Sequence, residues 1–452
     1  MIEIRTINNY LKWFIFFIIG VVVSGGINFY LNYESEQEFQ IDPEVKLDPE
    51  QEYQIVYWDY PLSWGLESSY KEFLEAKIAQ FEIEYPNIRV DYKLLSPLEG
   101  RTKLKESLVQ GSPPDIYNAI FGGGLFDKRL QLPLGLLFSQ EELALDRPLA
   151  LKSFRSEGKI WGLPHGLYPQ LWAANENVLR QSSLELAKVY QKGWNWQQFI
   201  KWTGEITDLE AEQKIIFHPH QAKLLMQLIA AGRGPKLYDG SGDFNAKRLK
   251  DAFTLLAKLR AEEVFPKPAK KMGKKMLARF WQGKAALIGP LTPWLLNSLY
   301  EQKKRYRKVE LTLLPIPIKG REYRKILVKA AGLILFRQEE YKGDQHSKAV
   351  YKFAQFINRA QNLYLREQLN IVTSYLPDYK EDKIIINHKL DRLLLGYIKR
   401  GIPYGPFNLK KWRQQKEIES ISGEEYSKFW LKNKVPSEIL REITTKAPNY
   451  HN

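Results

Sequence analysis

Aromatic side chains and a few carboxylates fall at the ends of predicted strands or in the loops that follow them. Flat rings can stack on the apolar face of a small ligand, and carboxylates can accept hydrogen bonds from its hydroxyl groups. A cleft that combined the two would suit a polar ligand with flat faces, such as a sugar. The candidates for ligand binding are Trp58, Asp59, Trp64, Glu67, Phe121, Tyr168, Trp172, Trp294 and Tyr375. We expect Trp161, Trp196 and Trp202 to belong to the core instead.

Catalytic and cofactor-binding patterns are missing from the sequence. The chain has no cysteine, which excludes a disulfide, a thiolate metal site and a catalytic thiol. The glycines at 122–124 lack the Gly-Lys-Ser/Thr of a P-loop, and the pair at 218 and 220 is more typical of a solvated turn than of a metal site. A glycoside hydrolase needs two carboxylates across a sugar, and no local motif pairs Asp59 with Glu67. We expect no catalytic residues, no cofactor and no metal.

The segment from Gln54 to Ile120 contains the elements that position the first candidates. The spacing of its apolar residues predicts strand, helix, strand, helix and strand at 55–59, 70–81, 88–94, 104–108 and 116–120. Pro86 ends the first helix and Gly111 ends the second. Ligands of such β-α-β-α-β units bind beyond the carboxyl ends of the strands, where Trp58 and Asp59 fall.

The rest of the chain continues as an α/β pattern without an internal repeat. Gln198 and Phe199 follow a predicted N-cap at Asn195. Further helices are expected at 224–231, 252–259 and 348–369 and over much of the last seventy residues. Strands are expected at the start of 170–179, in the middle of 280–294, at 311–317, where the strand ends in prolines, and at 328–336. Residues 371–379 are expected to form a non-helical aromatic loop, and Asp115 to cap or turn the chain.

Residues 13–31 contain no charged side chain, and a helix of that length can cross a bilayer. Basic residues precede the segment and acidic ones follow it, so we expect residues 1–12 in the cytoplasm and the bulk of the chain outside the cell membrane. A cleaved signal peptide, with small residues at 23–25, is the alternative. Residues 32–52 are polar and contain two prolines, which predicts a tether.

The net charge of +15 comes mostly from short lysine-rich patches. We interpret these patches as a solvated surface that keeps the protein soluble near an anionic membrane or wall. Nucleic-acid binding is not expected, because the sequence has no zinc spacing, no RNP-like pattern and no helix-turn-helix signal.

Seven short motifs follow one another between Ile55 and Pro377. They are FEIEYPNIRV at 81–90, GSPPDI at 111–116, GKIWGLP at 158–164, NWQQF at 195–199, FWQGKAA at 280–286, LPIP at 314–317 and LP at 376–377. In this order they resemble the motifs of extracellular solute-binding protein family 1, the sugar-binding group of ABC importers that includes maltose-binding protein. Two departures stand out: the lipobox cysteine is absent, and the tyrosine before the family's conserved asparagine is replaced in Trp172-Ala173-Ala174-Asn175.

The resemblance implies a two-lobed periplasmic-binding-protein-like α/β fold of type II, preceded by the transmembrane helix. It assigns residues 53–165 and 316–368 to lobe 1 and residues 166–315 and 369–452 to lobe 2. The implied function is that of an extracytoplasmic substrate-binding subunit of an ABC importer. Such a protein, expected to be a monomer, binds a carbohydrate such as an oligosaccharide in the cleft between its lobes and delivers it to the permease subunits.

Alternatives stay open at this point. A membrane-anchored ligand sensor or an adhesin would need the same anchor and the same binding domain. A glycoside hydrolase is the enzymatic alternative, and formation of a product that Asp59→Asn abolished would favour it. The ligand could be neutral or anionic, with the basic charge balance slightly favouring an anionic glycan.

Overall fold

The computed structural model describes residues 39–42, 44–61, 67–96, 99–120, 126–206, 213–216, 225, 246–262, 264, 274–303, 305–306, 308–318, 325–369, 371–377, 389–403, 425–426, 428–429 and 434–446. The chain divides into two compact units, Met1–Glu44 and Val45–Asn452, and every helix and strand given below belongs to the second. The membrane-spanning helix predicted at 13–31 lies outside the described residues. Among the helices of the described ranges, none is long and apolar enough to span a membrane.

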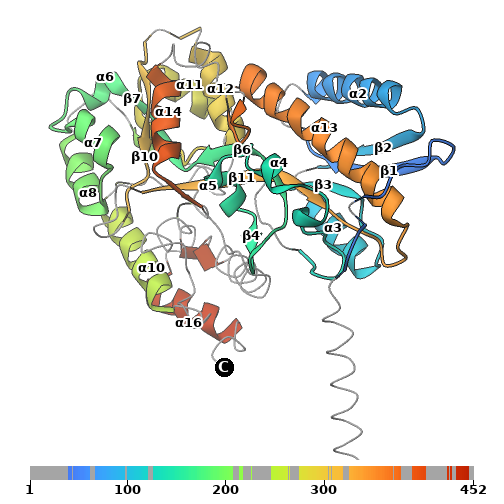
Figure 1. The fold of residues 1–452 in the computed structure, drawn as a ribbon. Coiled ribbons are helices and arrows are strands. Elements are labelled where there is room, and N and C mark those ends of the chain that lie inside the picture. Colours follow the sequence, from blue (N-terminus) through green and yellow to red (C-terminus); the bar gives the residue numbers. More distant parts are fainter. Residues whose placement is uncertain are drawn as a thin grey trace, which may run out of the picture. The chain divides into compact units, whose positions relative to one another are not determined.

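Within the described residues, the larger sheet has seven strands in the order β12-β6-β11-β3-β1-β2, with β13 paired to β11. Figure 1 labels β1, β2, β3, β6 and β11 of this sheet. Its strands are β1 (Tyr53–Asp59), β2 (Ile88–Leu94), β3 (Ile116–Asn118), β6 (Leu163–Pro169), β11 (Ile326–Leu335), β12 (Val372–Thr373) and β13 (Gly401–Pro403). Strand β1 runs parallel to β2 and β3, whereas β11 runs antiparallel to β3 and β6. Helices α2 (Glu67–Glu84) and α3 (Gly100–Val109) connect the first three strands, which confirms the predicted β-α-β-α-β unit.

Local sequence explains these boundaries. Alternate residues of β1 are buried, as the alternating apolar pattern requires. Helix α2 ends two residues before Pro86, and α3 is followed by Gly111 at a φ of 71°, a conformation that favours glycine. The long helix α13 (Asp344–Leu369) buries one stripe of side chains against the sheet, as the spacing of Val350, Phe353 and Ile357 predicts.

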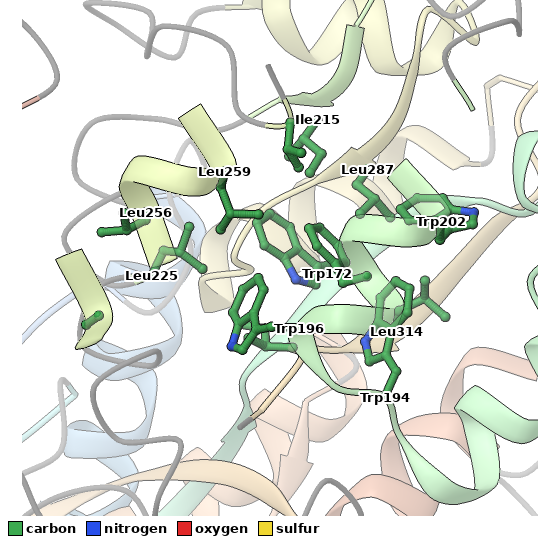
Figure 2. Close-up of a cluster of buried hydrophobic side chains, with 14 of the residues drawn as sticks. Trp172, Trp194, Trp196, Trp202, Ile215, Leu225, Leu256, Leu259, Leu287 and Leu314 are labelled. Carbon is green, nitrogen blue, oxygen red and sulfur yellow. The ribbon is translucent and has the colours of Figure 1, made fainter. Parts of the chain in front are cut away.

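The smaller sheet has the strand order β10-β7-β9-β8. Its strands are β7 (Leu171–Asn175), β8 (Gln213–Ile216), β9 (Ala285–Ile288) and β10 (Leu311–Pro315). Helix α8 (Trp196–Glu205) starts with the predicted cap, because Asn195 and Gln198 form a reciprocal capping box. Trp172, Trp194, Trp196 and Trp202 belong to one buried cluster with aliphatic residues of this sheet and of α10 (Ala246–Ala261) (Figure 2). The core positions expected for Trp161, Trp196 and Trp202 are confirmed.

The chain changes from one sheet to the other between β6 and β7, and again between β10 and β11. The first change occurs at the buried Gln170 and the second follows Pro315, the last residue of β10. Strands β12 and β13 come from the segment assigned to lobe 2, yet they pair with the larger sheet. The division into two lobes itself stays a prediction.

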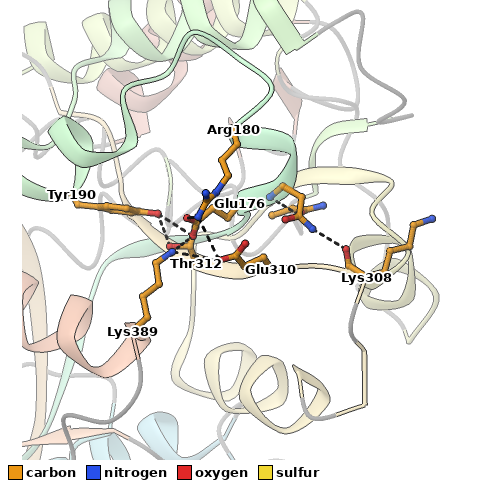
Figure 3. A network of polar contacts seen from close by, with 9 residues as sticks. Glu176, Arg180, Tyr190, Lys308, Glu310, Thr312 and Lys389 are labelled. Carbon is orange, nitrogen blue, oxygen red and sulfur yellow. Dashed lines mark hydrogen bonds and ion pairs between the residues drawn. The ribbon is translucent and has the colours of Figure 1, made fainter.

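An ion-pair network attaches helix α14 (Lys389–Lys399) to the smaller sheet. The carboxylate of Glu176, on α6 (Glu176–Leu179), is buried and forms ion pairs with Lys389 and, at 2.8 Å, with Arg180 (Figure 3). Burial alone would raise the pKa of Glu176, but the hydrogen bonds from Lys389 and Arg180 outweigh it and lower the pKa below its usual value. At the other end of the helix, the hydroxyl of Tyr397 donates to the carbonyl oxygen of Leu313 at 2.8 Å.

Shorter elements complete the described fold. They are η1 (Leu134–Leu136), α4 (Gln140–Leu143), α5 (Pro148–Lys152), β4 (Arg155–Ser156), β5 (Lys159–Ile160), α7 (Leu186–Lys192), α11 (Lys274–Trp281), α12 (Pro293–Lys303) and α16 (Pro436–Lys446). The helix predicted at 224–231 lies outside the described residues except for Leu225, which is helical.

Candidate ligand-binding site

The carboxyl end of β1 carries a carboxylate that solvent does not reach. Asp59 is fully buried, and its Oδ2 accepts hydrogen bonds from the hydroxyls of Tyr57 at 2.7 Å and Tyr70 at 2.6 Å. Its Oδ1 accepts from the backbone N–H of Tyr60 at 2.7 Å. The first residue after the strand is therefore held directly by the last side chain of the strand.

Two side-chain amides extend the network to other elements. Asn118, the last residue of β3, donates from Nδ2 to Asp59 Oδ1 at 2.6 Å, and Gln361 of α13 donates from Nε2 to Asp59 Oδ2 at 3.0 Å. The Oδ1 atom of Asn118 lies 2.9 Å from Nε2 of His165 on β6. Because the amide nitrogen of Asn118 faces the carboxylate, its oxygen faces His165, and Nε2 of His165 must carry the proton.

Burial decides the charge states in this network. It raises the pKa of Asp59, although hydrogen bonds from Tyr70 and Tyr57 act in the opposite direction, and it raises the pKa of both tyrosines well above their usual value. Burial also lowers the pKa of His165 to about 3, so the imidazole is neutral at pH 7. Within the described residues, Nδ1 of His165 has no hydrogen-bond partner.

The network is also attached to the segment 371–377. The hydroxyl of Ser374 donates to the carbonyl oxygen of Pro164 at 2.8 Å, and its backbone N–H donates to the carbonyl oxygen of His165 at 2.9 Å. Asn358 of α13 donates to the same Pro164 carbonyl at 3.0 Å. Strand β6 is thus held at its centre from β12 on one side and from α13 on the other.

These contacts make the network a rigid base and not the ligand pocket itself. Its polar side chains are buried and bonded to one another, so they leave no face open to a ligand. The hydrogen bonds of the network hold Tyr60 and Asn118 in place. The chain continues from these two residues into residues 61–66 and 119–125. The hydroxyls of Tyr60 and Tyr117 lie 2.7 Å apart and add a second link between the ends of β1 and β3.

Trp58 and Asp59 are neighbours in sequence but point to opposite faces of the sheet, as successive strand residues do. Trp58 is half-buried, and Nζ of Lys93 on β2 lies 5.6 Å from the centre of its ring. The ring is therefore partly accessible, whereas the carboxylate of Asp59 is fully buried.

Tyr168 is buried on β6 and lines a small apolar pocket. The pocket is formed by Leu167, Tyr168, Pro169, Leu291, Thr292, Leu296, Ile371, Val372 and Leu394. Its volume of about 10 Å³ leaves room for no more than one water molecule. In this conformation Tyr168 is closed to a sugar, but it lies where β6 and β12 meet the start of α12.

Trp172 lies in the core of the smaller sheet (Figure 2). It is fully buried on β7, and its ring stacks on Phe199 of α8 with centroids 6.5 Å apart and an interplanar angle of 18°. Its position in the structure is that of a packing residue, and no part of its ring is open to a ligand in this conformation.

Tyr375 is half-buried just after β12. Its backbone N–H donates to Oδ1 of Asn362 at 3.3 Å, and the guanidinium of Arg359 lies 6.0 Å from the centre of its ring. Trp64 and Phe121 lie outside the described residues. Glu67 begins α2 and Trp294 is the second residue of α12, but their side chains are not among those described.

Three members of the network were missed by reasoning from sequence: Asn118, His165 and Gln361. Gln361 could have been found, because it is a polar residue in the apolar stripe of α13, between Ile357 and Tyr364. Asn118 sits at the end of a short apolar strand, which is a weaker signal. Nothing in the local sequence of His165 marks it.

The described part of the chain contains no group of three or more His, Cys, Asp or Glu side chains that could hold a metal ion. In the site itself the tyrosines are protonated and the imidazole is neutral and buried. The arrangement is suited to holding backbone segments in place.

Comparisons with known proteins agree with the fold. The family of bacterial extracellular solute-binding proteins matches residues 64–362, which is more than half of the chain. No curated protein matches the sequence.

Several solved structures have a similar fold at low sequence identity. The maltose/maltodextrin-binding domain MalE from Bdellovibrio bacteriovorus, bound to maltotriose, is 19% identical, with a TM-score of 0.64 over 87% of this chain and 98% of its own. A chitin oligosaccharide binding protein is 16% identical, with a TM-score of 0.68 over 88% of this chain and 99% of its own. The ABC substrate-binding protein Lmo0181 from Listeria monocytogenes, in complex with cycloalternan, is 15% identical, with a TM-score of 0.64 over 88% of this chain and 100% of its own.

The family match and the fold indicate the same type of protein. The periplasmic-binding-protein-like α/β fold and the ordered motifs are those of a solute-binding subunit of an ABC transporter. The chain therefore belongs to the bacterial extracellular solute-binding protein family, whose members act outside the cytoplasm and are not enzymes.

Proposed function

We propose that this protein captures a carbohydrate, and specifically an oligosaccharide, and delivers it to the permease subunits of an ABC importer. The ligand would bind between two lobes, beyond the carboxyl ends of β1 and β3. Closure of the lobes on the ligand would create the surface that the permease recognises.

The observation that carries this proposal is the buried network around Asp59. It holds Tyr60 through the backbone N–H at 2.7 Å and Asn118 through the side-chain amide at 2.6 Å. The segments that leave these two residues contain Trp64 and Phe121. Residues held firmly at the start of two aromatic segments would suit a sugar platform, because stacking needs rings in set positions.

The ligand class is supported by what the similar structures bind. They include proteins in complex with maltotriose and with cycloalternan, and a chitin oligosaccharide binding protein. At identities below 20% these relatives do not specify which sugar this chain binds.

Among the candidate residues, we infer two groups. Residues proposed to contact the ligand are Trp58, Trp64, Glu67, Phe121, Trp294 and Tyr375. Residues proposed to support the site from buried positions are Asp59, Tyr168 and Trp172. The second group is the one whose side chains are closed to ligand in this conformation.

The proposed closing motion would use the two places where the chain changes sheets. Gln170 separates β6 from β7, and residues 316–325 separate β10 from β11. Rotation about these connections would move the smaller sheet as a unit. The helix proposed at 13–31 would retain the protein at the outer face of the membrane, in place of a lipid on an N-terminal cysteine.

Ligand titrations on the full chain, kept in mild detergent, test this function. Tryptophan fluorescence should change saturably with at least one of maltotriose, a chitin oligosaccharide and cycloalternan, and no product should form. Trp64→Ala and Phe121→Ala should each weaken binding about tenfold or more, since a buried aromatic anchor contributes about 2 kcal/mol.

Tyr306→Ala provides a matched control, because Tyr306 is an exposed aromatic that stacks on Trp281 away from the β1 and β3 ends. It should leave the affinity within about twofold. A broad sugar panel without saturable binding would refute the proposed function, and full affinity in both platform variants would refute the proposed place of the site.

A further inference from the structure

Helices α2 and α13 lie side by side over the larger sheet (Figure 1). Side chains of the two helices line an open groove. The volume of this groove is about 420 Å³, within the range of about 300 to 1,000 Å³ that small-molecule sites occupy. Its lining residues are Lys77, Gln80, Glu84, Tyr85, Lys352, Gln355, Phe356, Arg359, Ala360 and Leu363. None of them belongs to the network around Asp59 or to the proposed sugar platform.

The lining residues form one continuous stripe on each helix. On α2 they recur at intervals of three and four from Lys77 to Glu84, and on α13 they do so from Lys352 to Leu363. At 1.5 Å per residue, the α13 stripe is about 16 Å long. The groove is therefore an elongated surface feature that can hold several units of a short polymer.

Three cationic side chains face this groove without a carboxylate partner among the described residues. Lys77 bonds only to the Gln80 amide oxygen, at 2.9 Å. Lys352 lies over the ring of Tyr85, 4.9 Å from its centre, and Arg359 lies 6.0 Å from the ring of Tyr375. Three cations without a carboxylate partner among the described residues, gathered in one groove, form a local positive field.

The remaining lining gives the groove both polar and apolar contacts. Gln80 is exposed and offers an amide group, and Phe356 presents a half-buried ring that packs against Phe81 with centroids 5.3 Å apart. Leu363 is 40% exposed at the end of the stripe. Glu84 is the one acidic residue of the lining, so the groove keeps an excess of positive charge.

We propose that the groove between α2 and α13 is a second binding site, separate from the transport cleft, for an acidic saccharide chain of the uronate type. The carboxylates of the sugar would pair with Arg359 and Lys352, and Arg359 can bind a carboxylate through two parallel N–H donors. Ring faces would pack against Phe356, and hydroxyls would bond to Gln80. A protein held near an acidic glycan layer could use such a site to stay within that layer.

The shape of the site favours a chain-like glycan over the two other anionic partners. A membrane surface is flat and would not enter a groove between two helices. A docked peptide helix would need a row of apolar anchors, and the groove offers mainly Phe356, Ala360 and Leu363 on one side. An elongated cavity with cations, an amide and one ring matches a short acidic oligosaccharide better.

The test uses the full chain and measures binding of a galacturonic acid hexamer by isothermal titration at low and moderate salt. The fully methyl-esterified hexamer serves as the neutral counterpart with the same rings. The double variant Lys77→Glu/Lys352→Glu leaves Arg359 and its contact with Tyr375 in place. It is compared with Lys105→Glu/Lys152→Glu, which makes the same charge change at exposed positions of α3 and α5. Circular dichroism and thermal unfolding confirm that both variants fold.

The proposal expects the acidic hexamer to bind at least tenfold more tightly than its ester, with affinity that falls as salt rises. The groove variant should lose at least tenfold in affinity, while the control variant should stay within about threefold. Binding of the neutral sugar that occupies the transport cleft should be equal in all variants, which separates this inference from the proposed function.

Three results would overturn the proposal. The first is that the acidic hexamer does not bind. The second is that the control variant loses as much affinity for the hexamer as the groove variant does. The third is that hexaglutamate or anionic phospholipid vesicles bind more tightly than the hexamer and lose affinity in the groove variant. That result would assign the groove to a protein or a membrane.

Discussion

Removal of the Asp59 carboxylate should destabilise the protein through the donors that it leaves behind. Five donors converge on this carboxylate: the hydroxyls of Tyr57 and Tyr70, the backbone N–H of Tyr60, and the amides of Asn118 and Gln361. In Asp59→Ala the two hydroxyls can rotate toward Gln361 Oε1, which has no hydrogen-bond partner among the described residues. The amide of Gln361 keeps the hydroxyls of Tyr57 and Tyr70 as acceptors, at 2.8 and 2.9 Å, so two buried N–H groups, those of Tyr60 and Asn118, remain without an acceptor.

The size of the effect follows from these two groups. Each buried donor without an acceptor costs about 1 to 3 kcal/mol, and water entering the vacated space recovers part of that cost. Loss of a buried carboxylate, whose pKa burial raises, also relieves some desolvation. The net decrease in the free energy of unfolding should be about 3 kcal/mol. Asp59→Asn should cost less, about 1 kcal/mol, because its amide oxygen still serves Tyr60 and Asn118.

Urea unfolding followed by circular dichroism measures this difference at pH 7. Asp91→Ala is the matched control, since Asp91 is an exposed aspartate on the neighbouring strand β2, and it should change the stability by less than about 0.5 kcal/mol. A double-mutant cycle with Gln361→Leu should give a coupling of about 1 kcal/mol between Asp59 and Gln361. The reasoning fails if Asp59→Ala is no more destabilising than Asp91→Ala, or if the coupling is zero.

Three further variants test other parts of the structure. Burial lowers the pKa of His165 to about 3, so below about pH 6.5 the unfolded chain binds a proton that the folded chain does not. The wild type should therefore lose stability relative to His165→Gln as the pH falls from 6.5 toward 3, by up to about 1.4 kcal/mol per pH unit. Urea unfolding at a series of pH values measures this difference. Burial raises the pKa of Asp146 to about 7, so the stability should depend on pH in the opposite direction. Between about pH 4 and 7 the wild type should lose stability relative to Asp146→Asn as the pH rises. If the free energies of unfolding of the two proteins changed with pH in parallel, this prediction would be contradicted. Trp172→Ala should cost about 3 to 5 kcal/mol in the same unfolding assay, because it empties the centre of the cluster in Figure 2, and a cost below 1 kcal/mol would contradict its place in the core.

Periodicity was enough to predict the elements whose two faces differ. Strand β2 alternates buried and exposed positions, and α2 ends just before Pro86, so both were predictable from residues a few positions apart. Strand β7 is buried along its whole length, so the pattern of apolar residues does not distinguish one face of the strand from the other. That is why Trp172, an aromatic residue near polar ones in sequence, was interpreted as a ligand contact although its ring lies in the core.

The base of the site could not be predicted because its partners are distant in sequence. Asp59 was recognised as important from its place at the end of β1, but its bond to Gln361 joins residues 302 positions apart. A strand-end carboxylate has the same sequence signature whether it faces a ligand or a set of buried donors. Only the positions of β3, β6 and α13 around it decide between the two, and these depend on pairings that local sequence does not encode.

Hydrogen–deuterium exchange on the full chain, with and without a saturating oligosaccharide, tests the central claim most directly. If the ligand binds beyond the carboxyl ends of β1 and β3, peptides covering residues 60–66 and 119–125 should gain protection in the complex, while peptides from the α2 and α13 groove should not. Protection confined to other parts of the chain, or no change at 60–66 and 119–125 under conditions of full binding, would contradict the account.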